Sequence, residues 1–357
     1  MSDPGGEGGS VRYYCTAGNG MERFLTDEVE RKLAAEDVCQ MPGKVLFSSS
    51  ARIDRVSDLK AAERLFLLLK QDSPVQLSAR TSTAKAASVL QSRLLGDGAR
   101  WTSAVLTWSR LQRELAHRGT TVNTSSAAQS VVSKREEGRG SEEQTEEEEE
   151  EGRCNVETGK SAEGQREEEE MKTSGGEDKK LRIKPGFASS VPVSFRISCK
   201  CTGALSRLLS TQEVSRVIGV GLGRLLGWKA DLKNPQLEVN VHLSDDHCLL
   251  GIPLTRLPLA NRSYIKTTGL RSTVAWAMAS LAQIQPGFCV VDPMCGVGTI
   301  LIEAAQEHKA ACFLGVDIDD GQLQRANDNI EFAELGNRIH LLKASSMDVK
   351  HAPVSLN

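Results

Sequence analysis

The stretch FCVVDPMCGVGTILIEAA, residues 288–305, contains the clearest local pattern in the chain. Its first residues form a short apolar run, which is typical of a parallel strand covered on both faces. Gly296 and Gly298 then allow a tight turn, because glycine adopts positive φ at little cost and leaves room for a ligand beside the backbone. The apolar residues after Thr299 predict a helix whose free N–H groups point back toward that turn.

A second strand and helix follow in CFLGVDIDDGQLQRANDNI, residues 312–330. This strand ends at Asp317, which comes 19 residues after Gly298. An acidic side chain at that position is suited to accept hydrogen bonds from the ribose hydroxyls of an adenosine-containing ligand. The alternation of strands and helices predicts an α/β, Rossmann-like domain with a nucleoside cofactor.

Two nucleoside cofactors fit this pattern, and the residues around the turn separate them. A dinucleotide fingerprint requires G-x-G-x-x-G, but the sixth position counted from Gly296 is Leu301. Asp292 precedes the turn, and a carboxylate there suits a cationic ligand better than a pyrophosphate. The sequence therefore favours S-adenosylmethionine, with its sulfonium and amino groups, over NAD. A nicotinamide-dependent oxidoreductase is the less favoured alternative.

Charge is segregated along the chain of 357 residues, which has 44 basic and 47 acidic side chains in total. Residues 131–180 alone contain 18 acidic and 9 basic side chains, so the rest of the chain has a small basic excess. That excess permits contact with a polyanion without requiring it. Because acidic runs cannot bury enough apolar surface to fold, we expect residues 119–190 to be a disordered insertion.

Targeting and metal signals are sparse. Residues 1–10, MSDPGGEGGS, lack the features of a signal peptide and are expected to be disordered, and no uncharged apolar run is long enough to span a membrane. These features predict an intracellular protein without membrane association, and the nine scattered cysteines indicate a reducing compartment. Cys199 and Cys201 alternate on a predicted strand, so we assign no metal site.

Residues 11–78 are predicted to form a small α+β unit. RYYCTA reads as a strand and MERFLTDEVERKLAAE as a helix, followed by two strands joined through Pro42 and Gly43. RVSDLKAAERLFLLLK, residues 55–70, is predicted as a second helix. The order of elements is that of a ferredoxin-like layer.

Two segments flank the acidic insertion. Residues 79–118 are rich in predicted helix, and order returns with the strand VSFRISCKCTG, residues 193–203. Ser210 and Glu213 form a capping box, and Gly227 is a plausible helix stop. Two further strands, QLEVNVHL and HCLLGIPL, complete a unit that we assign to residues 79–118 and 191–265.

The sequence GWKADLKNPQLEVNVHL, followed by GIPL and by TTGLRSTVAWAM, resembles the THUMP domain-containing RNA guanosine N2-methyltransferase family. The resemblance covers roughly residues 11–118 and 191–357. It implies a ferredoxin-like layer with a THUMP RNA-binding domain, and then a partial Rossmann-like methyltransferase domain over residues 266–357 that includes the first three strands only.

By this resemblance the chain is an S-adenosylmethionine-dependent RNA (guanosine-N2) methyltransferase. Its RNA would be a transfer RNA or a small nuclear RNA, read by shape and phosphate contacts, and its partner a small zinc-binding activator subunit if the sheet is complete. The expected cofactor-binding residues are Asp292, Pro293, Gly296, Gly298, Thr299, Asp317, Ser346 and Asp348. The candidate RNA-binding residues are Arg196, Lys200, Lys229, Lys233 and Arg262.

Members of this family carry a further motif of the Asp-Leu-Pro-Phe-Gly kind after the fourth strand, and it does not occur here. We therefore assign no catalytic residue and expect a truncated isoform or incomplete gene model that does not transfer methyl groups by itself. A non-catalytic THUMP RNA-binding protein is the alternative. The basic run KKLRIK, residues 179–184, fits either a nuclear signal or a linker edge, so nucleus and cytoplasm both stay open.

Overall fold

We describe a computed structural model of the chain, which covers residues 9–77, 80–125 and 193–345. Most of the predicted N-terminal and acidic disordered segments, together with Ser346 and Asp348, lie outside these residues. Within them, no helix is both long enough and apolar enough to cross a bilayer.

The first unit has the predicted ferredoxin-like order. It contains β1 (Val11–Thr16), α1 (Glu22–Leu33), β2 (Glu36–Met41), β3 (Lys44–Ser49), α2 (Ile53–Val56) and β4 (Arg64–Asp72). The strands pair antiparallel in the order β2-β3-β1-β4. Gly43 turns the chain between β2 and β3 with φ of +70°, as the Pro-Gly pair predicted.

The predicted helix over residues 55–70 is wrong in its second half. Only the single turn α2 is helical, and the apolar run RLFLLLK lies in β4. β4 pairs with β1 on one side and with β8 on the other, and Leu65, Phe66, Leu67 and Leu69 are buried on its two faces. A central strand covered on both faces has no polar stripe, so its sequence is as uniformly apolar as that of a buried helix.

The second unit extends the same sheet. It contains α3 (Thr83–Leu95), α4 (Gly98–Ser125), β5 (Ser194–Cys201), a 3-10 turn η1 (Gly203–Arg207), α5 (Thr211–Leu226), β6 (Lys229–Ala230), β7 (Leu237–Leu243) and β8 (Cys248–Pro253). The full order of strands is β2-β3-β1-β4-β8-β7-β5-β6. α4 continues past residue 118, the predicted boundary of the insertion.

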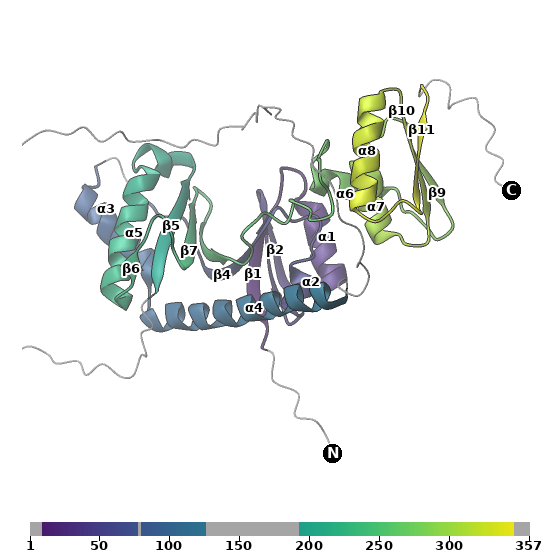
Figure 1. The fold of residues 1–357 in the computed structure, drawn as a ribbon. Helices are drawn as coiled ribbons and strands as arrows, with labels where there is room; N and C mark the ends of the chain where they lie inside the picture. The colour runs from purple at the N-terminus through teal and green to yellow at the C-terminus, as the bar shows by residue number, and fades with distance from the viewer. Residues whose placement is uncertain (1–8, 78–79, 126–192, 346–357) are drawn as a thin grey trace, which may run out of the picture. The chain divides into compact units, whose positions relative to one another are not determined.

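Local signals predicted the limits of α5 well. The Ser210–Glu213 capping box is present, and Gly227 ends the helix in the left-handed region. α5 lies against β5 and α3, while α1 lies on the strands of the first unit (Figure 1). Trp101 of α4 is fully buried against the edge of the Trp228 ring, so the two flanks of the acidic insertion share one core.

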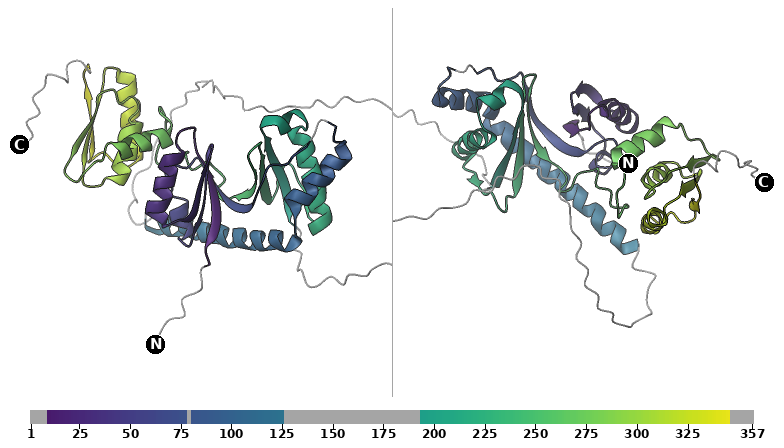
Figure 2. Two further views of the ribbon diagram at one scale, coloured as in Figure 1. Left: turned by 180° about the vertical axis from the view of Figure 1, so that it is seen from behind. Right: turned by 90° about the horizontal axis from the view of Figure 1, so that it is seen from above.

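The eight-stranded sheet is strongly bent. A β-bulge between Leu68 and Lys70 interrupts the pairing of β4 with β8, and bulges increase bending and twist. Figure 2 shows β4 curving from the first group of strands to the second. On the concave side the Tyr14 hydroxyl reaches the Asn240 Oδ1 at 3.3 Å, although β4 and β8 separate their strands.

The third unit has the predicted Rossmann-like alternation of strands and helices. It comprises α6 (Ser272–Leu281), β9 (Cys289–Asp292), α7 (Thr299–Glu307), β10 (Cys312–Asp317), α8 (Asp320–Phe332) and β11 (Ile339–Lys343). The three strands are parallel in the order β11-β10-β9, and α7 and α8 lie on one side of them (Figure 1). Consecutive right-handed crossovers place both helices on that side.

Candidate cofactor site

Asp292 and Asp317 lie at the same end of the three-stranded sheet. β9 and β10 are parallel, and Asp292 pairs with Gly315, so Asp317 is two residues farther along the neighbouring strand. Burial raises the pKa of Asp292, and the charge of Asp317 raises it further. The parallel strands therefore bring the two predicted carboxylates together at their carboxyl ends, which is where open α/β sheets bind ligands.

Asp317 organises the glycine turn. Its Oδ2 accepts a hydrogen bond from the Gly296 N–H at 2.9 Å, and its Oδ1 accepts one from the Asp319 N–H at 3.0 Å. A carboxylate oxygen can accept more than one hydrogen bond, so Asp317 retains acceptor capacity for a ligand hydroxyl.

Asp292 has one oxygen without a partner. Its Oδ1 accepts a hydrogen bond from the Met294 N–H at 3.2 Å. Its Oδ2 is buried and has no hydrogen-bond partner among the described residues. An unpaired buried carboxylate oxygen is unfavourable because burial removes its hydration without replacing it. A cationic group beside this atom would satisfy it, so the residues present fit the predicted methyl donor.

The two predicted glycines differ in their surroundings. Gly296 has φ of +52°, and a Cβ there would meet nothing closer than the Gln322 Oε1 at 4.0 Å. Gly298, at the start of α7, has φ of +81° and faces Ala326. Both need the left-handed conformation, but Gly296 is the one that leaves open space beside the backbone.

Thr299 and Pro293 differ in their burial. Thr299 is buried, and its Oγ1 accepts a weak hydrogen bond from the Gly269 N–H at 3.4 Å, so it links the turn to the chain before α6. Pro293 is exposed at the start of the turn. The two remaining predicted residues, Ser346 and Asp348, fall outside the described residues.

Sequence reasoning missed two residues that hold this turn in place. Asn329 of α8 is fully buried; its Oδ1 accepts from the N–H groups of Lys266 and Thr267, and its Nδ2 donates to the carbonyls of Thr267 and Val297. Gly315 allows close packing, because a Cβ at this position would lie only 2.8–2.9 Å from neighbouring side chains. An asparagine on the apolar face of a helix and a glycine inside a strand were the available signals.

The predicted RNA-binding residues are only partly gathered. Arg196 and Lys200 lie on the same face of β5. Lys229 of β6 pairs with Ser194, which is also on that face. Arg196 forms an ion pair with Glu238, N to O 2.5 Å, across to β7. Lys200, Lys229 and Lys233 are exposed.

Arg262 differs from the expectation of a surface cation. Its side chain is 3% exposed, and its Nε donates to the Glu303 Oε1 at 2.9 Å. Its Nη atoms donate to the carbonyls of Leu259 and Lys60. A guanidinium with these partners is unavailable to a phosphate, so Arg262 has a structural role. Burial raises the pKa of Glu303, while Arg262 opposes that shift.

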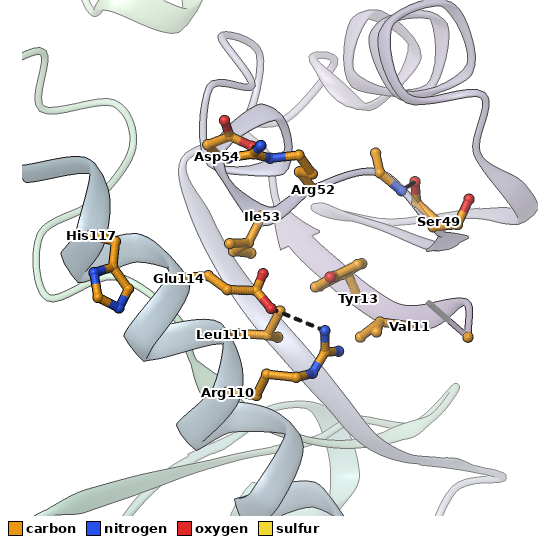
Figure 3. Close-up of a pocket in the computed structure, with 13 residues that line it drawn as sticks. Val11, Tyr13, Ser49, Arg52, Ile53, Asp54, Arg110, Leu111, Glu114 and His117 are labelled. Atoms are coloured by element: carbon orange, nitrogen blue, oxygen red, sulfur yellow. Dashed lines mark hydrogen bonds and ion pairs between the residues drawn. The ribbon is translucent and has the colours of Figure 1, made fainter. Parts of the chain in front are cut away.

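One cavity lies away from these carboxylates. A cavity of about 390 Å³ lies between β1, the start of α2 and α4, and Figure 3 shows Arg110, Glu114 and Tyr13 around it. Arg110 and Glu114 form an ion pair with each other at 3.1 Å. None of the lining residues comes from β9, β10 or β11, so the cavity is separate from the candidate cofactor site.

Two protein families match successive parts of the chain. Residues 177–252 match the THUMP domain family, and residues 260–355 match the RMKL-like methyltransferase domain family. The U6 snRNA (guanine-N(2))-methyltransferase THUMPD2 of Bos taurus is 40% identical over 95% of this chain and 69% of its own length. The tRNA (guanine(6)-N(2))-methyltransferase THUMP3 of Bos taurus is 35% identical over 39% of this chain and 28% of its own length.

A solved structure shows the same fold. SMU.472, crystallised with SAH, superposes with a TM-score of 0.57 at 14% identity, covering 98% of this chain and 78% of that one. The 40% identity with the Bos taurus U6 snRNA enzyme, over 95% of this chain, confirms the resemblance found in the sequence. This chain belongs to the THUMP domain-containing RNA guanine-N2-methyltransferase family.

Proposed function

We propose that this chain binds S-adenosylmethionine at the carboxyl ends of β9 and β10 and supports methylation of a guanine exocyclic amine in a structured RNA. The observation that carries the cofactor assignment is the unpartnered, buried Oδ2 of Asp292. Family membership supports the reaction type.

Each residue of the site has a distinct role in this proposal. S-adenosylmethionine, when bound, supplies a methyl group activated by its sulfonium. Asp292 pairs with the positive charge of the donor, and Asp317 accepts hydrogen bonds from ribose hydroxyls while it fixes the Gly296 N–H. Gly296 leaves the backbone accessible, because a Cβ there would occupy the open space beside the turn.

For the RNA we propose a small nuclear RNA ahead of a transfer RNA. Similarity to the U6 snRNA enzyme extends over 95% of this chain, whereas similarity to the tRNA enzyme covers 39%. The exposed cations of β5 and β6 supply phosphate contacts, which are how proteins usually bind duplex RNA. A nuclear RNA would also favour the nucleus as the site of action.

A calorimetric titration with S-adenosylmethionine tests the cofactor site. We expect Asp292→Asn to bind the donor at least about tenfold more weakly, since a contact to a charged group contributes about 1.5–3 kcal/mol. Glu331→Gln, on the exposed side of α8, is the matched control and should bind normally. Absence of any heat with the wild-type chain would contradict the proposal and favour a non-catalytic RNA-binding protein.

Catalysis by the 357-residue chain is a separate question. We assign no described residue to the attack of the guanine amine, and the absence of turnover by this chain alone stays a prediction. Radiolabelled methyl transfer to U6 snRNA and transfer RNA transcripts tests it, with and without the zinc-binding activator subunit that we propose as partner. Turnover by the chain alone would contradict the prediction.

A further inference from the structure

Four basic side chains from distant parts of the sequence lie on the face of the eight-stranded sheet that carries Tyr14 and Asn240. Lys44 begins β3, Lys200 lies in β5, His242 lies in β7 and His247 precedes β8. We call these four residues the Lys–His cluster. Strands β1, β4 and β8 separate β3 from β7 in the sheet, so this cluster exists only because the sheet bends.

The bend is supported by a close contact across it. The Tyr14 side chain passes over β8 to Asn240, and a Cβ on Gly251 would lie 2.3 Å from the Tyr14 ring. Gly251 therefore has to be glycine for β1 to approach β7. Tyr14 also stacks on Phe66 with ring centroids 4.5 Å apart, which fixes the approach.

Lys44 is buried without a counter-charge. Only 9% of the residue is exposed, and among the described residues its ammonium makes no ion pair or hydrogen bond. Burial, followed by the charge of Lys200, lowers the pKa of Lys44 to about 8. A buried lysine that lacks a carboxylate partner is unfavourable for the fold and is typical of a ligand site.

The two histidines experience the same positive field. Burial, followed by Lys44, His247 and Lys200, lowers the pKa of His242 to about 4. Burial and Lys44 also lower the pKa of His247, and Asp246 is the acidic group that opposes this shift. The balance of charge around the cluster is therefore positive.

Hydrogen bonds hold the histidine rings in fixed orientations. His242 Nδ1 and His247 Nε2 are 3.2 Å apart, and His247 Nδ1 lies 3.1 Å from the Ser244 Oγ. Both ring nitrogens of His247 are thus engaged. The Nε2 of His242 makes no hydrogen bond with a described residue and is not sealed from solvent, so it is available to a ligand.

We propose that the Lys–His cluster is a binding site for a phosphate group, held by the ammonium groups of Lys44 and Lys200 and by the Nε2–H of His242. The ammonium groups attract an anion and repel a metal ion, and among the described residues no third metal-ligating side chain joins the two histidines. A phosphate oxygen group accepts several hydrogen bonds at once and matches two neighbouring cations. We assign this phosphate to the RNA, and this assignment rests on the proposed function.

The test is a titration of the full 357-residue chain with inorganic phosphate, followed by NMR of the histidine side-chain nitrogens, with chloride at equal ionic strength as the reference. We expect saturable shifts at His242 and His247. Lys44→Met should abolish them and weaken the binding of labelled U6 snRNA about tenfold, because it removes a charge-assisted contact. Lys85→Met, the same change at an exposed position of α3, should leave both unchanged.

The possible results test the phosphate site separately from the cofactor site. Unchanged histidine signals in the wild-type chain, or normal RNA affinity in Lys44→Met, would overturn the proposal. Phosphate binding that U6 snRNA fails to displace would overturn the assignment to RNA and point to a free phosphate. Calorimetry of Lys44→Met with S-adenosylmethionine should match the wild type, so a missing donor signal would count against the proposed function and leave this site untouched.

Discussion

Each of the two sheets in the described part of the chain contains a charged side chain without an ion-pair partner, and the two charges have opposite signs. In the eight-stranded sheet it is Lys44, a residue that is only 9% exposed, and in the three-stranded sheet it is Asp292, whose Oδ2 is buried. The first sheet belongs to the half that we propose binds an RNA polyanion, and the second to the half that we propose binds a cationic methyl donor. In both proposals the unpaired charge is opposite in sign to the ligand that would complete the site.

The two sheets also differ in how far their faces are buried. The central strands of the first sheet are buried on both faces. In the second, β9 is an edge among the described strands, and Val291 and Leu342 are 44% and 49% exposed on the face opposite α7 and α8. An edge strand with unpaired backbone groups favours association.

The largest expected effect concerns a buried charge that does have a partner. Arg262→Met leaves Glu303 buried without its counter-ion, so we expect a loss of about 3–5 kcal/mol in the free energy of unfolding. Urea denaturation measures it. The double variant Arg262→Met with Glu303→Leu should recover most of that loss, because neither charge then remains.

RNA affinity tests whether Arg262 has only a structural role. Arg262→Met, measured below its unfolding transition, should bind RNA like the wild type, since its guanidinium is already occupied by protein acceptors. Weaker RNA binding by the folded variant would indicate that Arg262 contacts the RNA, and it would contradict the structural role.

An intermediate effect is expected from pH at Lys44. Because its pKa falls to about 8 in the fold, the unfolded chain binds more protons between pH 8 and 10.5, and folding stability rises with pH there. Lys44→Met should therefore be more stable than the wild type at pH 7, by no more than about 3 kcal/mol. That advantage should disappear by about pH 10.5. Paired thermal melts across this range measure it, and a constant difference would contradict the burial of an unpaired charge.

The smallest effect is the counterpart at Asp292. Its pKa is raised in the fold by burial, so the charged form destabilises the native state at neutral pH. Asp292→Asn should raise the melting temperature slightly at pH 7, and this gain should vanish as pH falls below the unfolded value of an aspartate. Stabilisation combined with loss of donor affinity is the expected signature of a binding residue. A lower melting temperature at pH 7 would indicate that Asp292 is structural.

The candidate cofactor site was largely predictable because its signals are local. The strand, glycine turn and helix around Gly296 follow one another in sequence, and parallel strands necessarily place Asp292 and Asp317 at one end. Arg262 was misjudged because burial of a charged side chain depends on its partner, and Glu303 lies 41 residues away. Likewise the run at Leu65–Leu69 has no periodicity that separates a central strand from a buried helix.

The sequence by itself determined the caps of α5 and the strand, glycine turn and helix of the cofactor site, since these depend on backbone conformation and neighbours within a few residues. Tertiary structure alone decided which cations are exposed and which are buried, and it brought Lys44 to His242 across three intervening strands. The physical reason is that a bend in a sheet sums small twists and one bulge over many strands. No single stretch of sequence contains that sum.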